Sequence, residues 1–262
     1  MSDDFFETGD GPALLFLPGS YSTASAWKSV HAALRGRYRL ISTSLPGYGP
    51  ARDPRSHEDA DYRHITSWLA GVADRIGTAF HLIGHSFGGL ISIAACFEAT
   101  VKPQSLLTFE GNPVYVRTGV ADVAWRKDAD QACTDFFSAW QAGAPDAPRH
   151  IIDFWGQSGV WDTMPEPVQA FCRNKVETNV LDWKSAISFA PELADLARIT
   201  VPTTFARGAL ANQAMIQTTK LLVDTLPDAR EATVDGAGHF LISTHPEACA
   251  AIVDQHMARV AS

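Results

Sequence analysis

The chain has 262 residues, of which 46% are hydrophobic and 19% are charged, and 21 basic against 29 acidic residues give it a net charge of −8. A chain of this length buries roughly 70–75% of the surface of its unfolded state, so we expect one substantial core with an insertion rather than two independent domains. The acidic balance, with no cluster of Lys and Arg, argues against nucleic acid or an anionic membrane as a partner.

The cysteines and the N-terminus indicate the compartment. Cys96, Cys133, Cys172 and Cys249 are scattered and never stand at Cys-x-x-Cys spacing. We therefore expect reduced thiols rather than disulfides or a zinc site. The acidic start, residues 1–7, lacks the basic and apolar regions of a signal peptide. No apolar run approaches the ~18–20 residues that a membrane span needs. These features predict a cytoplasmic protein.

Strands and helices alternate in the first part of the chain. Residues 5–8 and 13–17 are predicted strands around a Gly-Asp-Gly turn. The second is apolar on both faces, as is typical of a central strand in a covered sheet. An amphipathic helix is expected over 25–36, a strand over 38–43 and a second helix over about 60–76.

The next segment predicts a strand, a very tight turn and a helix. A short apolar run at 79–83 precedes Gly-His-Ser-Phe-Gly at 84–88, and residues 90–96, which contain no helix breaker, follow it. In so tight a turn the residues on either side of the apex must lack side chains, because a side chain there would collide with the strand or the helix. The apex residue, Ser86, then points its hydroxyl outward at the positive end of the helix. This pattern predicts a nucleophile.

Helical periodicity dominates the middle of the chain. From about 114 to 190 the sequence is helical and rich in aromatic residues, and it contains five of the seven tryptophans. We expect most of these aromatic side chains to hold the segment together and some to face a cleft. The elements around this segment, strands at 105–109, 200–206 and 230–234 and helices at about 213–226 and 246–260, predict an α/β protein with a mostly parallel sheet covered by helices on both faces.

A serine nucleophile needs a base within hydrogen-bond reach. His239 lies in a glycine-bounded loop just after the last predicted strand. A parallel sheet would bring this loop to the same edge as Ser86, so we predict that His239 is the base. His85 is expected to pack or hydrogen-bond locally. His57 and His64 lie in a charged stretch and are expected to be solvated rather than to bind a metal.

The Gly-x-Ser-x-Gly turn at 84–88 and the Gly-x-Gly-His loop at 236–239 resemble those of the α/β-hydrolases, and the resemblance extends over most of the chain. It implies the α/β-hydrolase fold with a helical lid. The lid is predicted over 113–190, inserted between the core segments 1–112 and 191–262.

The resemblance also implies an oxyanion hole made of two backbone N–H groups. One is that of Phe87. The other comes from the loop Pro18-Gly19-Ser20, where Ser20 is the predicted donor and Pro18 stands where the family commonly has His. A second loop departs from the family pattern, because Ser44 occupies the place of a common acid in Asp-x-Pro-Gly-x-Gly. The role of that acid is therefore expected to be absent or relocated.

The base histidine needs an acceptor that fixes its tautomer. In many α/β-hydrolases an Asp after the seventh strand does this, but the corresponding loop here, 208–213, has no carboxylate. Glu110, which ends the strand after the elbow helix, resembles the acid of haloalkane dehalogenases, and we predict that it orients the histidine. Asn212 and Asp235 remain alternatives, as does a structural role for Glu110 in a turn or an ion pair.

These residues predict a serine hydrolase that cleaves a small apolar or aromatic ester through an acyl-enzyme on Ser86, without a metal or other cofactor. The same three residues suit two alternatives, hydrolysis of a C–C bond and cofactor-free perhydrolysis. A third alternative is a ligand-binding receptor with little turnover. A serine at the elbow disfavours a halide-releasing enzyme. Fold alone decides none of these, and the sequence leaves the substrate and the oligomeric state open.

Overall fold

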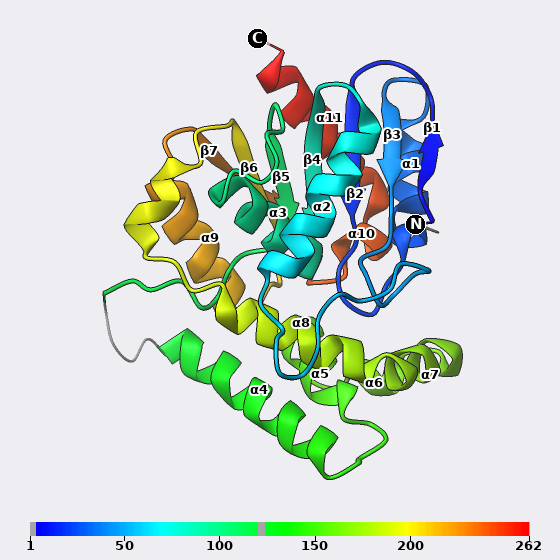
Figure 1. Cartoon of the computed structure of the whole chain (residues 1–262), viewed down its shortest axis with the longest axis vertical. Coiled ribbons are helices and arrows are strands. Elements are labelled where there is room, and N and C mark those ends of the chain that lie inside the picture. Colours follow the sequence, from blue (N-terminus) through cyan, green and yellow to red (C-terminus); the bar gives the residue numbers. More distant parts are fainter. Residues whose placement is uncertain (1–3, 120–123, 262) are drawn as a thin grey trace.

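The computed structural model describes residues 4–119 and 124–261, and in them seven strands form one sheet in the order β1-β3-β2-β4-β5-β6-β7 (Figure 1). β1 runs antiparallel to β3, and the other neighbouring strands are parallel. The strands are β1 (Phe6–Thr8), β2 (Ala13–Leu17), β3 (Arg39–Ser42), β4 (Phe80–His85), β5 (Leu106–Phe109), β6 (Thr203–Gly208) and β7 (Ala229–Val234).

Helices cover both faces of this sheet, as predicted. Side chains alternate along a strand, so in β2 Leu14 and Phe16 belong to the core on one face, and Leu15 and Leu17 to the core on the other. Because both faces are covered, every residue of β2 is buried. The first core includes α1 (Lys28–Leu34), α10 (Leu241–Thr244) and α11 (Pro246–Val260), and the second includes α2 (Arg63–Ile76), α3 (Phe87–Phe97) and α9 (Gln213–Thr225).

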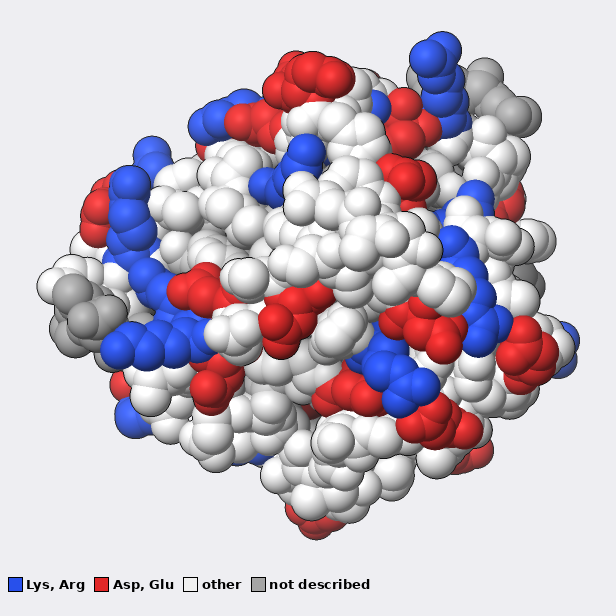
Figure 2. Space-filling view, turned by 90° about the horizontal axis from the view of Figure 1, so that it is seen from below, with Lys and Arg blue, Asp and Glu red and all other residues white. Residues whose placement is uncertain are grey.

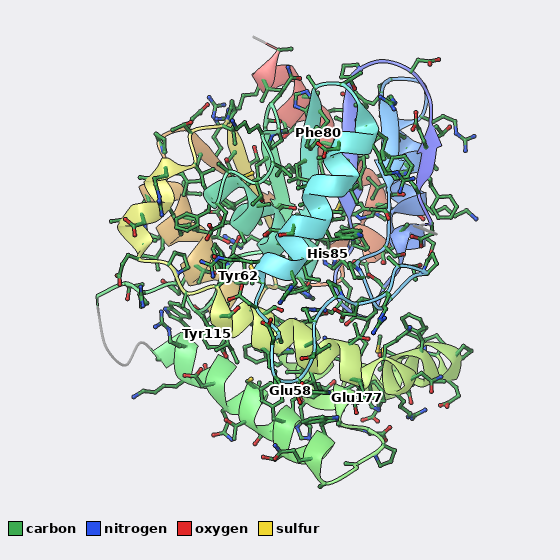
Figure 3. All side chains as sticks on the ribbon, viewed as in Figure 1. Glu58, Tyr62, Phe80, His85, Tyr115 and Glu177 are labelled. Carbon is green, nitrogen blue, oxygen red and sulfur yellow. The ribbon has the colours of Figure 1, made fainter. Side chains whose placement is uncertain are left out.

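Five helices between β5 and β6 form an insertion at one edge of the sheet (Figure 1). Phe80 and His85 lie at the two ends of β4, and His85 lies at the end that faces the insertion (Figure 3). The insertion has a small core of its own around Phe136, Val180 and Trp183. Its helices are α4 (Ala124–Gln141), α5 (Pro148–Gly156), α6 (Val160–Thr163), α7 (Glu166–Asn174) and α8 (Val176–Ser188).

The limits predicted for the core and the lid stay predictions. Residues 1–3 and 262 of the predicted core, and residues 120–123 of the predicted lid, lie outside the described residues. On the face seen from below, charges of both signs mingle around a broad uncharged area (Figure 2). Among the described residues, no helix combines the length and the apolar character that crossing a bilayer requires.

Several predicted elements differ in their limits, among them the first helix and the strand predicted over 200–206. The first helix is divided into a 3-10 turn, η1 (Ala24–Trp27), and α1. The strand predicted over 200–206 is β6, which is the sixth strand described rather than the seventh and begins at Thr203. Pro202 explains this start, because proline has no N–H to donate to the ladder. A further 3-10 helix, η2 (Leu193–Arg198), precedes this strand.

A carboxylate from another part of the chain lies against the loop that contains Ser44. The N–H of Ser44 donates to Asp4 at 2.9 Å, and the Ser44 hydroxyl donates to the same carboxylate. The Ser44 oxygen in turn accepts the N–H of Ala24 at 2.9 Å. A carboxylate therefore does lie beside position 44, but it comes from the N-terminal segment.

Candidate active site

The turn after β4 has the geometry that its sequence predicts. Ser86 adopts φ 52° and ψ −126°, an uncommon conformation for a residue other than glycine. A Cβ on Gly84 would lie 2.6 Å from the carbonyl oxygen of Gly88, and a Cβ on Gly88 would lie 2.3 Å from that of Pro18. Glycine is therefore required on both sides of the serine. The turn is held by the N–H of Ser86, which donates to the carbonyl of Phe109 at 2.9 Å.

The site lies where the order of the sheet reverses. After β2 the chain forms β3 on one side of that strand, and then β4 on the other. In open α/β sheets such a reversal leaves a crevice at the carboxyl ends of the strands. The loop after β2 enters it, because a Cβ on Gly19 would lie 3.3 Å from the Ser86 hydroxyl. Ser20 therefore lies next to a residue in contact with Ser86.

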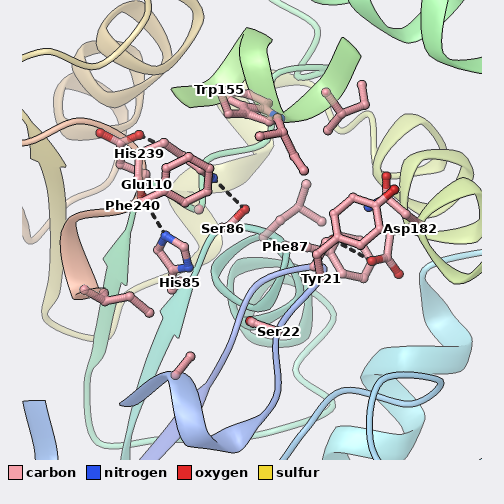
Figure 4. A pocket seen from close by; sticks show the side chains of 18 of the residues that line it. Tyr21, Ser22, His85, Ser86, Phe87, Glu110, Trp155, Asp182, His239 and Phe240 are labelled. Carbon is pink, nitrogen blue, oxygen red and sulfur yellow. Dashed lines mark hydrogen bonds and ion pairs between the residues drawn. The ribbon is translucent and has the colours of Figure 1, made fainter. Parts of the chain in front are cut away.

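The structure brings Ser86, His239 and Glu110 together from three segments (Figure 4). His239 Nε2 lies 3.0 Å from Ser86 Oγ, and His239 Nδ1 lies 2.9 Å from Glu110 Oε2. The other oxygen of Glu110 accepts the N–H of Gly208 at 2.8 Å. Glu110 is 2% exposed, follows β5, and has φ 47°.

Aromatic rings and a second histidine surround His239. Trp155 of α5 stacks on the imidazole, with ring centroids 5.3 Å apart and planes 24° apart. The edge of Phe240 meets the same ring at 5.5 Å. His85 Nε2 lies 2.9 Å from the carbonyl oxygen of His239. Burial, helped by the nearby His239, lowers the pKa of His85 to about 3, so His85 is neutral and donates Nε2–H to that carbonyl.

Asn212 and Asp235, the two alternatives to Glu110 as the acceptor for His239, have other partners or lie elsewhere. Asn212 Oδ1 caps α9 by accepting the N–H of Met215 at 2.9 Å, and its amide nitrogen donates to Phe154 O at 3.1 Å. Asp235 is exposed. The structure thus brings Glu110, and neither of these two residues, into contact with His239.

The two histidines in the charged stretch lie at the surface. His57 pairs with Glu177, and His64 pairs with Asp59. Within residues 4–119 and 124–261, no group of three or more Cys, His, Asp or Glu side chains is arranged to hold a metal ion.

The backbone N–H groups of Phe87 and Ser20 lie at the site without acceptors among the described residues. Phe87 begins α3, so its N–H is one of the free donors at a helix start. Ser20 is fixed through its side chain, because its hydroxyl donates to Asp182 Oδ2 of α8 at 2.5 Å.

These residues open into a mainly apolar cavity of about 230 Å³. It lies between the edge of the sheet and the insertion, and α5 and α8 contribute to its wall. The apolar lining includes Phe87, Leu90, Ile151, Trp155, Trp183 and Phe240.

One buried polar group in this wall was not predicted from the sequence. Asp182 accepts hydrogen bonds from Tyr48 at 2.7 Å and from Arg55 at 2.8 Å, in addition to that from Ser20. Burial raises the pKa of the Asp182 carboxyl, and these three donors act in the opposite direction. The signal in the sequence is a single acid within the apolar run Val180-Leu181-Asp182-Trp183.

Comparisons with known proteins show the family of the chain. The model of the alpha/beta hydrolase family matches residues 14–252. Pimeloyl-(acyl-carrier protein) methyl ester esterase of Nitrosomonas europaea is 30% identical over 118 residues, 45% of this chain, and the match covers less than half of that protein, 44%. Fluoroacetate dehalogenase of a Burkholderia species is 24% identical over 95% of this chain and 88% of that protein.

Solved structures share the fold. An alpha/beta hydrolase from Sphaerobacter thermophilus superposes with a TM-score of 0.77 at 21% identity, over 97% of this chain and 96% of that chain. A thermophilic esterase from Thermogutta terrifontis gives a TM-score of 0.76 at 16% identity, over 99% of this chain and 94% of that chain.

Proposed function

Because the chain belongs to the alpha/beta hydrolase family, as its motifs predict, we propose that it is a serine hydrolase that cleaves small apolar or aromatic esters. The observation that supports this proposal most directly is the pair of hydrogen bonds of His239, 3.0 Å to Ser86 and 2.9 Å to Glu110. They lie at the wall of a cavity with a mainly apolar lining, which suits a small apolar substrate.

The first half of the reaction acylates the serine. The Glu110 carboxylate accepts the Nδ1–H of His239, so the lone pair of Nε2 faces the Ser86 hydroxyl. As the Ser86 oxygen attacks the ester carbonyl, Nε2 takes its proton. The tetrahedral oxyanion accepts hydrogen bonds from the N–H groups of Phe87 and Ser20. One such donor is worth on the order of 10²–10³ in rate.

The second half releases the acid. Protonated His239 gives its proton to the leaving alcohol, which departs and leaves the acyl group on Ser86. His239 then takes a proton from water, the resulting hydroxide attacks the acyl carbonyl, and the Ser86 oxygen leaves and regains a proton from the imidazole.

We further propose that residues 113–190 act as a lid. The support is that α5 and α8 supply Ile151, Trp155, Asn179 and Trp183 to the wall of the cavity. A lid of this kind excludes water from the acyl-enzyme and shapes the acyl site.

A fluorophosphonate probe followed by p-nitrophenyl esters of increasing acyl length tests the proposal. We expect covalent labelling on Ser86, turnover of short and medium acyl chains, and loss of both in Ser86→Ala. Labelling without turnover would favour the receptor alternative. Without either labelling or turnover in the wild-type protein, the hydrolase proposal fails.

A further inference from the structure

Four buried polar atoms of residues in the cavity wall lack hydrogen-bond partners among the described residues: His85 Nδ1, Asn112 Oδ1, the hydroxyl of Tyr21 and Asn179 Oδ1. The last two belong to side chains that flank Asp182. Asn179 is 1% exposed. A buried polar group without a partner is unfavourable, so the Tyr21 hydroxyl and Asn179 Oδ1 indicate a ligand that completes their bonds.

The two side chains flank the same buried group. Asn179 and Asp182 lie three residues apart on α8 and therefore on one face of that helix. The Asn179 side chain hydrogen-bonds Tyr48, which in turn donates to Asp182 at 2.7 Å. The rings of Tyr21 and Tyr48 meet edge to face at 6.3 Å.

This polar group lies at the end of the cavity away from His239. Figure 4 shows Tyr21 and Asp182 on one side of Ser86, and His239 on the other. A substrate whose carbonyl lies at Ser86 and whose chain extends away from His239 would reach the polar group with its far end.

The charge around the cavity disfavours an anion. Among the described residues that line the cavity there is no Lys or Arg, and its acidic side chains are Glu110 and Asp182. Arg55 lies behind Asp182 and is engaged there, since it donates to Asp53, to Ser185 Oγ at 2.9 Å and to Asp182 at 2.8 Å. A carboxylate bound at this end would be desolvated without a cation to pair with.

We propose that Tyr21 and Asn179 form a subsite for a neutral group that both donates and accepts hydrogen bonds, such as a hydroxyl or a primary amide, at the far end of the substrate. This inference rests on the proposed esterase function and specifies its substrate class. A hydroxyl or an amide accepts from the Tyr21 hydroxyl and donates to Asn179 Oδ1. A methyl group leaves both unpaired, and a carboxylate has no hydrogen to give to Asn179.

A matched series of esters tests the subsite. It consists of the p-nitrophenyl esters of hexanoic acid, 6-hydroxyhexanoic acid, adipamic acid and adipic acid, which end in a methyl, a hydroxyl, an amide and a carboxylate. We expect kcat/KM for the hydroxyl and amide esters to exceed that of the methyl ester about tenfold, and the carboxylate ester to be the poorest. In Tyr21→Phe and Asn179→Leu, the ratio of hydroxyl to methyl ester should fall toward one.

Tyr38→Phe is the matched control, because it removes a phenolic hydroxyl that donates to Asp254 at 2.9 Å outside the cavity lining. It should keep the wild-type ratio. If the wild type hydrolyses the methyl and hydroxyl esters equally well, or prefers the carboxylate ester, the subsite is refuted while the esterase proposal stands. The same holds if the preference survives in both cavity variants.

A binding measurement tests the subsite independently of turnover. Calorimetry of the same four esters with Ser86→Ala should give the same order of affinity, tightest for the hydroxyl and amide esters. Equal affinities overturn the subsite. If the wild type hydrolyses none of the esters and its Ser86 is not labelled, the esterase proposal fails instead.

Discussion

At the scale of single residues, the contacts of Glu110 show how an acid after β5, rather than one after β6, reaches His239. One oxygen accepts the N–H of Gly208 at 2.8 Å, and this leaves the other directed at His239 Nδ1, 2.9 Å away. Both partners are donors, so only a side chain with two acceptor atoms satisfies them. The positive φ of Glu110, 47°, is a local cost of this placement.

Glu110→Gln tests the tautomer argument. An amide has one acceptor and one donor. If its NH₂ faces His239, the imidazole must carry its proton on Nε2 and cannot accept that of Ser86. If it faces Gly208, two donors clash. We expect kcat to fall by about 10²–10⁴-fold while the melting temperature changes little, as measured by initial rates and thermal unfolding.

Asn212→Ala and Asp235→Asn are the controls, because neither side chain contacts His239. Both variants should keep most of the wild-type rate. Near-wild-type turnover in the glutamine variant would refute the assignment of Glu110, and a large loss in either control would transfer the role to that residue.

The stack of Trp155 on His239 predicts a second effect on rate. An indole face stabilises a nearby cation by about 0.5–2 kcal/mol, and the imidazolium forms during acylation. Trp155→Leu should therefore lower kcat/KM about tenfold. Trp140→Leu is the matched control, since Trp140 stacks in a similar way, at 5.3 Å and 17°, on His57 outside the cavity. Equal losses in the two variants would show that only the fold of the insertion matters.

The individual residues differ in how well the sequence predicts them. Ser86, His239 and Glu110 follow strand ends, and parallel strands bring their ends to one edge, so the sequence predicts that they lie close together. Chain order alone does not distinguish Glu110 from Asn212 or Asp235, which also follow strands. Trp155 was one of five tryptophans in the insertion, and periodicity does not tell which surface a helix face meets. Asp182 was not predicted, because a charged side chain is normally exposed.

At the scale of elements, α8 is tied to the core by polar contacts rather than by apolar packing alone. Arg55 joins Asp182 at 2.8 Å, and both side chains are buried. Lys175 Nζ donates to the carbonyl of Gly47 at 2.6 Å, and Lys184 Nζ donates to that of His57 at 2.9 Å. These contacts fix one wall of the cavity to the core loop between β3 and α2.

Breaking the buried pair should be costly. Arg55→Met leaves Asp182 buried without its cation, which typically lowers the free energy of unfolding by about 3–5 kcal/mol. The double variant with Asp182→Leu should recover part of this loss. Arg149→Met is the control, because the Arg149–Asp162 pair is 38% and 62% exposed and should change stability by less than ~1 kcal/mol. Urea unfolding gives the free energy of unfolding of all three variants. Equal losses in the two single variants would contradict the argument.

The elements themselves were largely predictable. Alternation of apolar residues and the breakers between them indicated each strand, and the errors lie at ends such as Pro202. The sequence did not predict that β1 pairs with β3 rather than β2, nor that Asp4 supplies the carboxylate next to Ser44. Both depend on contacts across some 40 residues of chain, which local patterns do not encode.

At the scale of the whole molecule, buried neutral histidines link stability to pH. At the far edge of the sheet from Ser86, His256 Nε2 lies 2.7 Å from Ser105 Oγ, and His81 Nδ1 lies 2.7 Å from the same oxygen. Burial is the main cause that lowers the pKa of His256 to about 3, and burial also lowers that of His81. The pKa of His31 is lowered to about 4 and that of His85 to about 3. Several histidines therefore resist protonation in the folded state.

The sign of the effect follows from linkage. Below pH 6.5 the unfolded chain binds a proton on each of these histidines and the folded chain does not, so stability falls as the pH falls toward the folded-state pKa values. For His256 the loss between pH 7.5 and pH 5 is about 2 kcal/mol. His256→Gln should remove this part of the pH dependence, although it lowers stability at pH 7.5. Urea unfolding of both proteins at the two pH values measures the difference, and identical pH dependence would mean that His256 is protonated without unfolding.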